Sequence, residues 1–110
     1  MITNYCMTPF AGIGTTFELQ PQDTVIAIGG AGILNCFSPP SLPPAQISWT
    51  KNFAQLSNDQ RFMVLQNGSL AISGAVLEDQ GVYYCTATNA LLGVSRTSQP
   101  AQITTIGTQI

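Results

Sequence analysis

The residues that could support chemistry in this chain of 110 residues are three cysteines and five carboxylates. Histidine is absent, which removes the most common general base and the most common metal ligand together. No serine or cysteine therefore has a histidine to activate it as a nucleophile, and no glycine-rich phosphate cradle is present. The sequence predicts a protein that is not an enzyme, with no cofactor and no metal site. The carboxylates are Glu18, Asp23, Asp59, Glu78 and Asp79.

Glu78 and Asp79 are the only adjacent pair of carboxylates. Neighbouring side chains along a loop or strand diverge, so this pair is not expected to share a proton. The three cysteines, Cys6, Cys36 and Cys85, allow two interpretations from their number alone. They are a disulfide pair with one remaining thiol, or three structural thiols.

Charge is scarce in this sequence. Charged residues make up 7% of the chain and the net charge is -2, whereas an ordinary soluble domain has roughly 25% charged residues. Three basic residues are too few for a nucleic-acid face or a polybasic membrane patch. With 45% hydrophobic residues, the chain is expected to fold as one nearly neutral domain.

Membrane insertion by this segment is not expected, because no apolar run reaches the roughly 18 residues that a span requires. No basic start precedes an apolar stretch, so a signal peptide is not expected either. If the protein works outside the cell, the chain is expected to be an excerpt of something longer or to be exported by other means.

Short runs rich in β-branched and aromatic residues alternate with turn residues along most of the chain. Alternation with period two, as in Ile47/Trp49 and Leu70/Ile72, is typical of strands buried on one face. The pattern predicts an all-β sandwich of two antiparallel sheets. A final strand, with Pro100 near its middle, is expected at a sheet edge. The expected strands are 24–28, 32–36, 46–50, 61–65, 69–72, 82–88 and 95–104.

The ends of the chain differ from this pattern. Residues 1–16 show no clear period and contain one proline and two glycines, so they are interpreted as a loosely ordered N-terminal leader or linker. The folded domain is expected over residues 17–106, followed by a C-terminal tail at 107–110.

One constellation of residues is highly specific. Trp49 lies between Cys36 and Cys85, and residues 79–85 read Asp-Gln-Gly-Val-Tyr-Tyr-Cys. This chain resembles the immunoglobulin superfamily over about residues 17–105. The interval between the two cysteines is too short for the extra strands of an antibody variable domain, and further motifs look like the I-set type. The resemblance implies an immunoglobulin-like Greek-key sandwich.

The same resemblance implies structural roles for individual residues. It implies a disulfide between Cys36 and Cys85, which in turn implies an oxidising, extracellular compartment. It also implies a salt bridge between Arg61 and Asp79, and it leaves Cys6 as the odd thiol. The residues implied for the core and for a tyrosine corner are Trp49, Tyr83, Leu34 and Leu70.

A finer resemblance concerns guidance receptors. Residues 17–25, 34–36, 64–70 and 93–96 look like early ectodomain modules of neogenin, protogenin and roundabout receptors. This resemblance implies a module of a cell-surface or secreted protein, with protein recognition or spacing within a tandem array as its task. Two alternatives stay open: an ectodomain module of a receptor tyrosine kinase or phosphatase, and an intracellular muscle-type I-set domain. Phe53 departs from the pattern, since the relatives usually place a turn glycine there.

Asn67 begins the only Asn-x-Ser/Thr sequence of the chain, Asn67-Gly68-Ser69, and is a candidate for glycosylation. A simpler explanation is that Asn-Gly is the preferred two-residue hairpin turn, because both residues tolerate positive φ. The turn is the favoured reason for these residues, and glycan attachment stays open.

Binding through a surface is the remaining function. On the strand at 82–88, Tyr84 and its alternate neighbours are expected to face outward, on a face with little charge. Leu91 and Leu92 are expected at a hairpin tip, with Phe53 near the adjacent connection, and such exposed apolar groups indicate an interface. The expected partners are a protein ligand or a second copy of the chain, and neighbouring immunoglobulin or fibronectin-type domains. Packing against a neighbouring domain and chance exposure are the alternatives.

Overall fold

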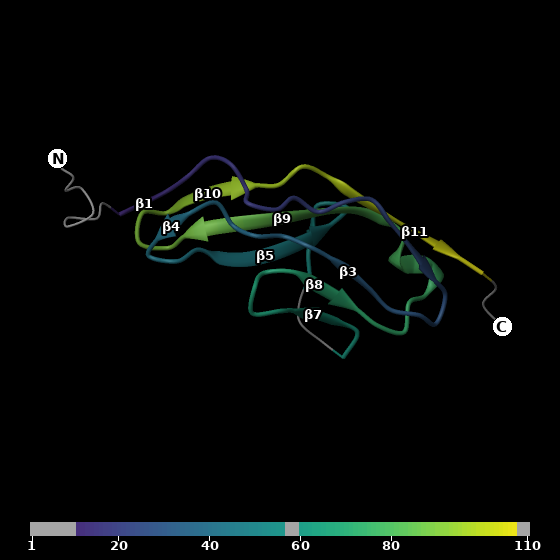
Figure 1. Cartoon of the computed structure of the whole chain (residues 1–110). Helices are drawn as coiled ribbons and strands as arrows, with labels where there is room; N and C mark the ends of the chain where they lie inside the picture. The colour runs from purple at the N-terminus through teal and green to yellow at the C-terminus, as the bar shows by residue number, and fades with distance from the viewer. Residues whose placement is uncertain (1–10, 57–59, 108–110) are drawn as a thin grey trace.

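Strands dominate the part of the chain that the computed structural model describes, which is residues 11–56 and 60–107 (Figure 1). The strands are β1 (Gly12–Ile13), β2 (Thr24–Ala27), β3 (Gly32–Leu34), β4 (Ser41–Leu42), β5 (Gln46–Lys51), β6 (Ala54–Gln55), β7 (Phe62–Val64), β8 (Leu70–Ile72), β9 (Gly81–Asn89), β10 (Val94–Thr97) and β11 (Ala101–Ile106). A 3-10 helix, η2 (Leu77–Asp79), precedes β9. Within the described residues, no helix is long and apolar enough to cross a membrane.

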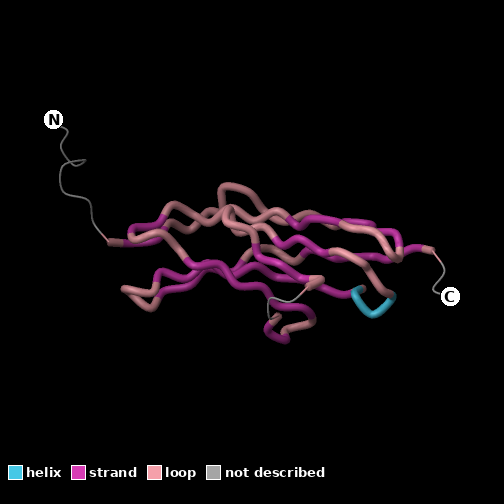
Figure 2. The backbone as a smooth tube through the Cα atoms, turned by 90° about the horizontal axis from the view of Figure 1, so that it is seen from below, coloured by secondary structure: helices cyan, strands magenta, loops and turns pink. Residues whose placement is uncertain are grey.

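Two sheets form the layers of a sandwich. The larger has the order β2-β11-β9-β5-β6, with β10 also paired to β9, and the smaller has the order β3-β8-β7. The first and last described residues lie at opposite ends of the molecule, and η2 lies near the end where the chain leaves β11 (Figures 1 and 2). The expected all-β sandwich is confirmed.

One ladder departs from the expected antiparallel pairing. Leu19 pairs with Phe37 beside β3, but the following strand β2 pairs in parallel with β11 in the other sheet. Pro21 is fully buried between these two pairings. Proline has no N–H to donate to a ladder, so the chain can leave the neighbourhood of β3 at Pro21 and cross to the larger sheet.

The expected last strand is interrupted. Val94–Thr97 and Ala101–Ile106 both pair with β9, and residues 98–100 between them do not continue the ladder. Ser98 bridges the gap, because its N–H donates to the Cys85 carbonyl at 2.8 Å and its hydroxyl accepts the Cys85 N–H at 2.9 Å. The expected edge position is wrong for β11, which lies between β2 and β9. Pro100 therefore breaks the strand and does not mark an edge.

The core lies between the two sheets. Inward residues alternate with outward ones along β9 and β11 of the larger sheet and along β8 of the smaller sheet. Gly32 fits this packing because a Cβ there would lie 2.6 Å from Cδ1 of Ile26. Side chains that are 0–1% exposed include Leu34, Trp49, Leu70, Ile72, Tyr83 and Ile103.

The segment before residue 17 is partly structured. Gly12–Ile13 pairs with Ser41–Leu42, and the Gly14 N–H donates to the Pro40 carbonyl at 2.7 Å. Arg96 adds to this contact, because its Nε donates to the Gly14 carbonyl at 3.0 Å. Pairing thus begins inside the segment expected as a leader. Residues 1–10, including Cys6, and residues 108–110 of the expected tail lie outside the described residues.

Candidate recognition surface

A disulfide joins the two layers at the centre of the sandwich. Cys36 follows β3 of the smaller sheet and Cys85 lies in β9 of the larger, with 2.04 Å between the two sulfur atoms. Trp49 lies directly opposite Cys85 in the neighbouring strand β5, and its Nε1 donates to the Gly68 carbonyl at 2.9 Å. The single indole N–H is therefore satisfied within the core.

Tyr83 forms a corner at the start of β9. Its hydroxyl is buried and donates to the Asp79 carbonyl at 2.6 Å. Burial, followed by the nearby Asp79 carboxylate, raises the pKa of the Tyr83 hydroxyl well above its ordinary value. The hydroxyl thus stays protonated and ties β9 to η2.

The Asp79 side chain makes a second set of contacts at this corner. Arg61 binds its carboxylate in a two-point contact of 2.7 and 3.0 Å, and the Val76 N–H donates to it at 2.9 Å. Asp79 is 2% exposed, and this burial opposes ionisation. The hydrogen bonds from Arg61 and Val76, with the charges of Arg61 and Lys51, outweigh burial and lower the Asp79 pKa below its ordinary value.

The outward sides of β5, β9 and β10 form a face without charged side chains, which we call the outer face. The strand register places its residues side by side across the strands. Thr50 lies opposite Tyr84, and Thr86 lies between Ser48 and Thr97. Hydroxyl and amide groups dominate, so the face offers donors and acceptors together. Its members on β5, β9 and β10 are Gln46, Ser48, Thr50, Val82, Tyr84, Thr86, Thr88, Ser95 and Thr97.

An aromatic pair stands at one end of the outer face. Phe53 stacks on Tyr84 with 5.4 Å between ring centroids and an interplanar angle of 27°. Asn52 and Phe53 form the two-residue turn between β5 and β6, with φ of 51° and 69°. Such turns favour glycine at the second position, and a bulky residue there is strained. Phe53 is nonetheless 80% exposed, so it presents its ring to solvent from an unfavourable backbone position.

Leu91 and Leu92 lie far from this pair. They follow the end of β9 at Asn89, whereas Phe53 adjoins the β5 terminus that lies opposite Tyr83. Both leucines are exposed, at 69% and 46%. The expectation that Phe53 lies near their hairpin is wrong, because β5 runs antiparallel to β9 and its hairpin returns at the opposite end.

Asn89 organises the leucine end of the molecule and was not among the predicted site residues. It is fully buried, and its Nδ2 donates to the Gly12 and Leu42 carbonyls, at 3.1 Å each, and to the Ser41 hydroxyl at 3.2 Å. Its Oδ1 accepts the Leu92 N–H at 3.2 Å. The inward alternation of Tyr83, Cys85 and Ala87, extended by two residues, is the sequence signal that could have found it.

The turn that contains Asn67 differs from the predicted two-residue hairpin. The Leu65 N–H donates to the Ser69 carbonyl and the Gly68 N–H to the Leu65 carbonyl, which leaves a three-residue loop. Gly68 has φ of 100°, whereas Asn67 is not in the left-handed region. A three-residue loop with its last residue left-handed is a common hairpin connection, so only Gly68 requires positive φ. The Asn67 side chain is exposed.

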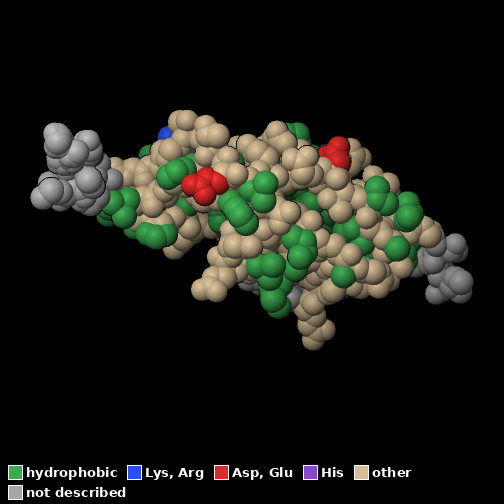
Figure 3. Space-filling view, viewed as in Figure 1, with side chains coloured by type: hydrophobic (Ala, Val, Ile, Leu, Met, Phe, Trp, Pro, Cys, Tyr) green, Lys and Arg blue, Asp and Glu red, His purple; other side chains and the backbone are tan. Residues whose placement is uncertain are grey.

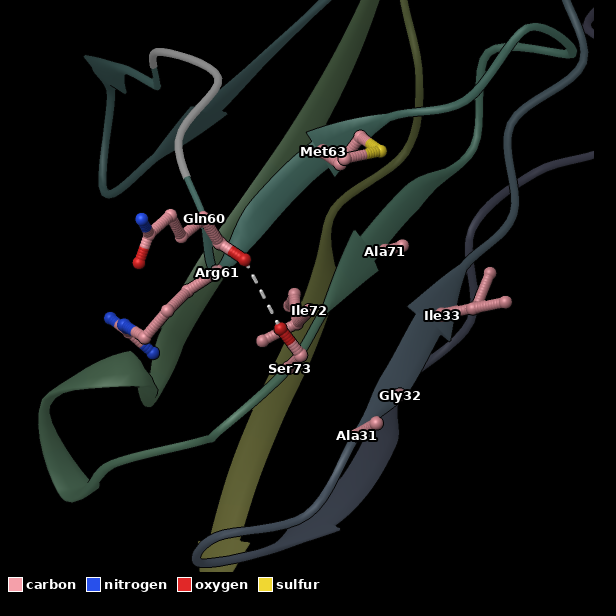
Figure 4. A pocket seen from close by; sticks show the side chains of 9 residues that line it. All are labelled: Ala31, Gly32, Ile33, Gln60, Arg61, Met63, Ala71, Ile72 and Ser73. Carbon is pink, nitrogen blue, oxygen red and sulfur yellow. Dashed lines mark hydrogen bonds between the residues drawn. The ribbon is translucent and has the colours of Figure 1, made fainter.

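The opposite side of the sandwich carries an apolar groove of about 480 Å³ that the sequence did not indicate. Ile33, Ala71 and Met63 stand in register across β3, β8 and β7, and Met63 is 54% exposed. Hydrophobic side chains gather over these strands in Figure 3. Figure 4 shows Gln60 and Arg61 lining the groove where the chain enters β7, on the side away from Ile33. There the Ser73 hydroxyl donates to the Gln60 carbonyl at 3.4 Å.

Among the described residues, no three His, Cys, Asp or Glu side chains gather into a group that could hold a metal ion. Of the predicted candidates, the structure brings Phe53 and Tyr84 together and places Leu91 and Leu92 elsewhere. Asp59 lies outside the described residues.

Comparison with known proteins agrees with this architecture. The sequence profile of the immunoglobulin domain matches residues 16–105. The human peroxidasin homolog is 44% identical over 75 residues, which cover 68% of this chain and 5% of that protein. Human Roundabout homolog 2 is 34% identical over 88 residues, which cover 80% of this chain and 6% of that protein. The chain thus spans about a twentieth of the length of these relatives.

A solved structure gives the same picture. The N-terminal Ig1-2 module of the Drosophila receptor protein tyrosine phosphatase DLAR superposes with a TM-score of 0.76 at 25% identity. The superposition covers 88% of this chain and 48% of that one. One unit of a two-unit array therefore matches nearly the whole described fold.

Proposed function

This chain belongs to the immunoglobulin domain family, and we propose that it is a non-catalytic I-set module of a cell-surface adhesion or guidance receptor that recognises a protein partner. Its place of work is extracellular, which the disulfide between Cys36 and Cys85 supports, because such bonds do not persist in the cytosol of ordinary cells. The similarity to Roundabout homolog 2 supports the receptor assignment.

The observation that carries the proposal is the stacked pair of Phe53 and Tyr84. Two aromatic rings at the end of an uncharged face provide the large, desolvatable contact that anchors many protein interfaces. Strain at an exposed Phe53 is not needed for the sandwich itself, since a turn glycine would serve the hairpin better. We assign partner contact to the outer face with this pair as its anchor.

A second role is spacing within a tandem array. The chain covers 5% of the peroxidasin homolog and 48% of the DLAR two-domain structure, which supports neighbouring modules before or after it. The exposed Leu91 and Leu92 lie at the end where β1 enters the domain, so they suit contact with a preceding module. The fold is equally compatible with a receptor phosphatase ectodomain, where any chemistry lies elsewhere on the longer chain.

The test compares binding of fluorescent, tetrameric fusions of the whole chain to intact cells by flow cytometry. We expect Tyr84→Ala and Phe53→Gly to lose most of the binding of the wild type, while Met63→Ala, a change of an exposed side chain on the opposite sheet, keeps it. Circular dichroism shows whether each variant is folded. Equal binding by wild type and Tyr84→Ala would contradict the assignment of the outer face.

A further inference from the structure

In the motif Asn67-Gly68-Ser69, the first residue is exposed to solvent and the last is buried in the core. Asn67 is exposed, and its Nδ2 donates no hydrogen bond to any described residue. Ser69, two residues on, is 1% exposed. The acceptor motif for N-linked glycans needs both the asparagine amide and this hydroxyl, so the native fold presents only half of it.

Hydrogen bonds hold Ser69 in place. Its Oγ accepts the Cys36 N–H at 3.3 Å and donates to Oδ1 of Asn35 at 3.3 Å. Its N–H donates to Oδ1 of Asn67 at 2.9 Å. Cys36 is in turn tied to Cys85, so formation of the disulfide fixes the strand end against which the Ser69 hydroxyl rests.

Gly68 prevents the loop from opening without wider unfolding. Its carbonyl accepts the Trp49 indole N–H, and its N–H donates to the Leu65 carbonyl at 2.9 Å. A Cβ at this position would lie 2.7 Å from the Cys36 carbonyl oxygen, so the loop backbone packs directly on the core strand. Exposing Ser69 therefore requires disruption of contacts to Trp49 and Cys36.

We propose that Asn67 is an N-glycan acceptor only before the domain folds, and that closure of the sandwich around Ser69 ends its modification. In the step, Nδ2 of Asn67 bonds to the anomeric carbon of a lipid-linked oligosaccharide diphosphate. The bond from that carbon to the diphosphate oxygen breaks, the lipid diphosphate leaves, and Nδ2 loses one proton. Oδ1 is untouched and still accepts the Ser69 N–H, so the modified chain can complete the same turn.

This inference rests on the proposed extracellular role, because glycan transfer acts on chains that enter the secretory pathway. The consequence is an order of events: glycan first, burial of Ser69 second. Slow formation of the Cys36–Cys85 disulfide then raises the glycosylated fraction, and fast folding lowers it.

The test uses the whole chain made without glycan and supplied to a purified oligosaccharyltransferase with lipid-linked oligosaccharide. One sample is oxidised and native. The other is reduced and alkylated, with loss of the near-ultraviolet circular dichroism signal as proof of unfolding. Asn67→Gln, reduced in the same way, is the control without an acceptor.

We expect the unfolded chain to gain the glycan mass and the native chain to react at least about a thousandfold more slowly, because only the rare unfolded fraction exposes Ser69. Equal modification of both samples would overturn the proposed order, and no modification of the unfolded chain would overturn the acceptor assignment. Neither result depends on partner binding by the outer face, so failure here and failure of the proposed function are distinguishable.

Discussion

Phe53 stacks its ring on Tyr84 at 5.4 Å while its own backbone lies in the left-handed region, at φ of 69°. The two residues come from a hairpin turn and from the middle of a long strand, and together they form the aromatic part of the outer face. A strained residue whose side chain is exposed does not repay its strain by burial in the core. The outer face therefore carries its aromatic pair at a cost in backbone strain, and this cost supports the partner contact that we propose.

Two substitutions at Phe53 separate strain from stacking. Phe53→Ala loses the ring and keeps the unfavourable backbone angle, whereas Phe53→Gly loses the ring and relieves the angle. We expect Phe53→Gly to be more stable than Phe53→Ala by about 1 kcal/mol in urea unfolding. Equal stabilities, or a less stable glycine variant, would show that the turn is not strained at this residue.

Tyr83→Phe tests the corner. The variant removes the hydroxyl that donates to the Asp79 carbonyl at 2.6 Å, and leaves that buried acceptor with one hydrogen bond fewer. We expect a loss of about 1 to 2 kcal/mol in the free energy of unfolding and a lower melting temperature. Tyr84→Phe is the matched control, since the Tyr84 side chain lies on the outer face. Its melting temperature should equal that of the wild type. An unchanged melting temperature for Tyr83→Phe would show that the hydrogen bond from the Tyr83 hydroxyl to the Asp79 carbonyl does not stabilise the fold.

Asp79 makes stability depend on pH in a defined direction. Its folded-state pKa lies below its ordinary value. The ionised carboxylate therefore contributes its full stabilisation when the pH is above the ordinary aspartate pKa, and this contribution is lost as the pH falls through the folded-state pKa. We expect Asp79→Asn to be less stable than the wild type at pH 7. The difference should shrink as the pH falls from about 4, where the unfolded chain takes up the proton, through the lower folded-state pKa, where the native carboxylate is also protonated. Unfolding free energies of both proteins across this range check the prediction, and a constant difference would contradict it.

Asn89→Ala tests the buried amide at the leucine end. It removes the Nδ2 group that the Gly12 and Leu42 carbonyls and the Ser41 hydroxyl share, and the Oδ1 atom that accepts the Leu92 N–H, so each of these groups loses a hydrogen-bond partner. We expect a loss of about 2 to 3 kcal/mol, with faster amide hydrogen exchange in β1 and β4 than in β9. Ser95→Ala, which removes an exposed hydroxyl contact with Thr88, should change stability by less than about 0.5 kcal/mol. If both variants were equally stable, Asn89 would have no organising role.

Much of the fold follows from local pattern. Period-two alternation places Trp49 and Tyr83 on inward positions, and the structure buries both. The parallel pairing of β2 with β11 was not predicted, since it depends on where the chain crosses between sheets at Pro21, and no local pattern encodes the partner of a strand. The split of the last strand depends in the same way on a side chain, the Ser98 hydroxyl, that replaces a ladder contact.

The surface was predicted less completely than the core. The outward position of Tyr84 followed from alternation, but the stacking of Phe53 on it depends on the reach of a hairpin turn. The groove on the other sheet draws on Ile33, Ala71 and Met63, which lie far apart in sequence and meet only through strand register. Side chains that become neighbours through register leave no signal within any one segment.

The most direct test of the account is a titration of reactive thiols in denaturant, on protein made in a secretory host. The proposed function requires a module that is closed by the Cys36–Cys85 bond and that works outside the cell. It predicts one reactive thiol per chain, that of Cys6, and a rise to three after reduction. Three reactive thiols before any reductant is added would contradict both the closed disulfide and the extracellular role.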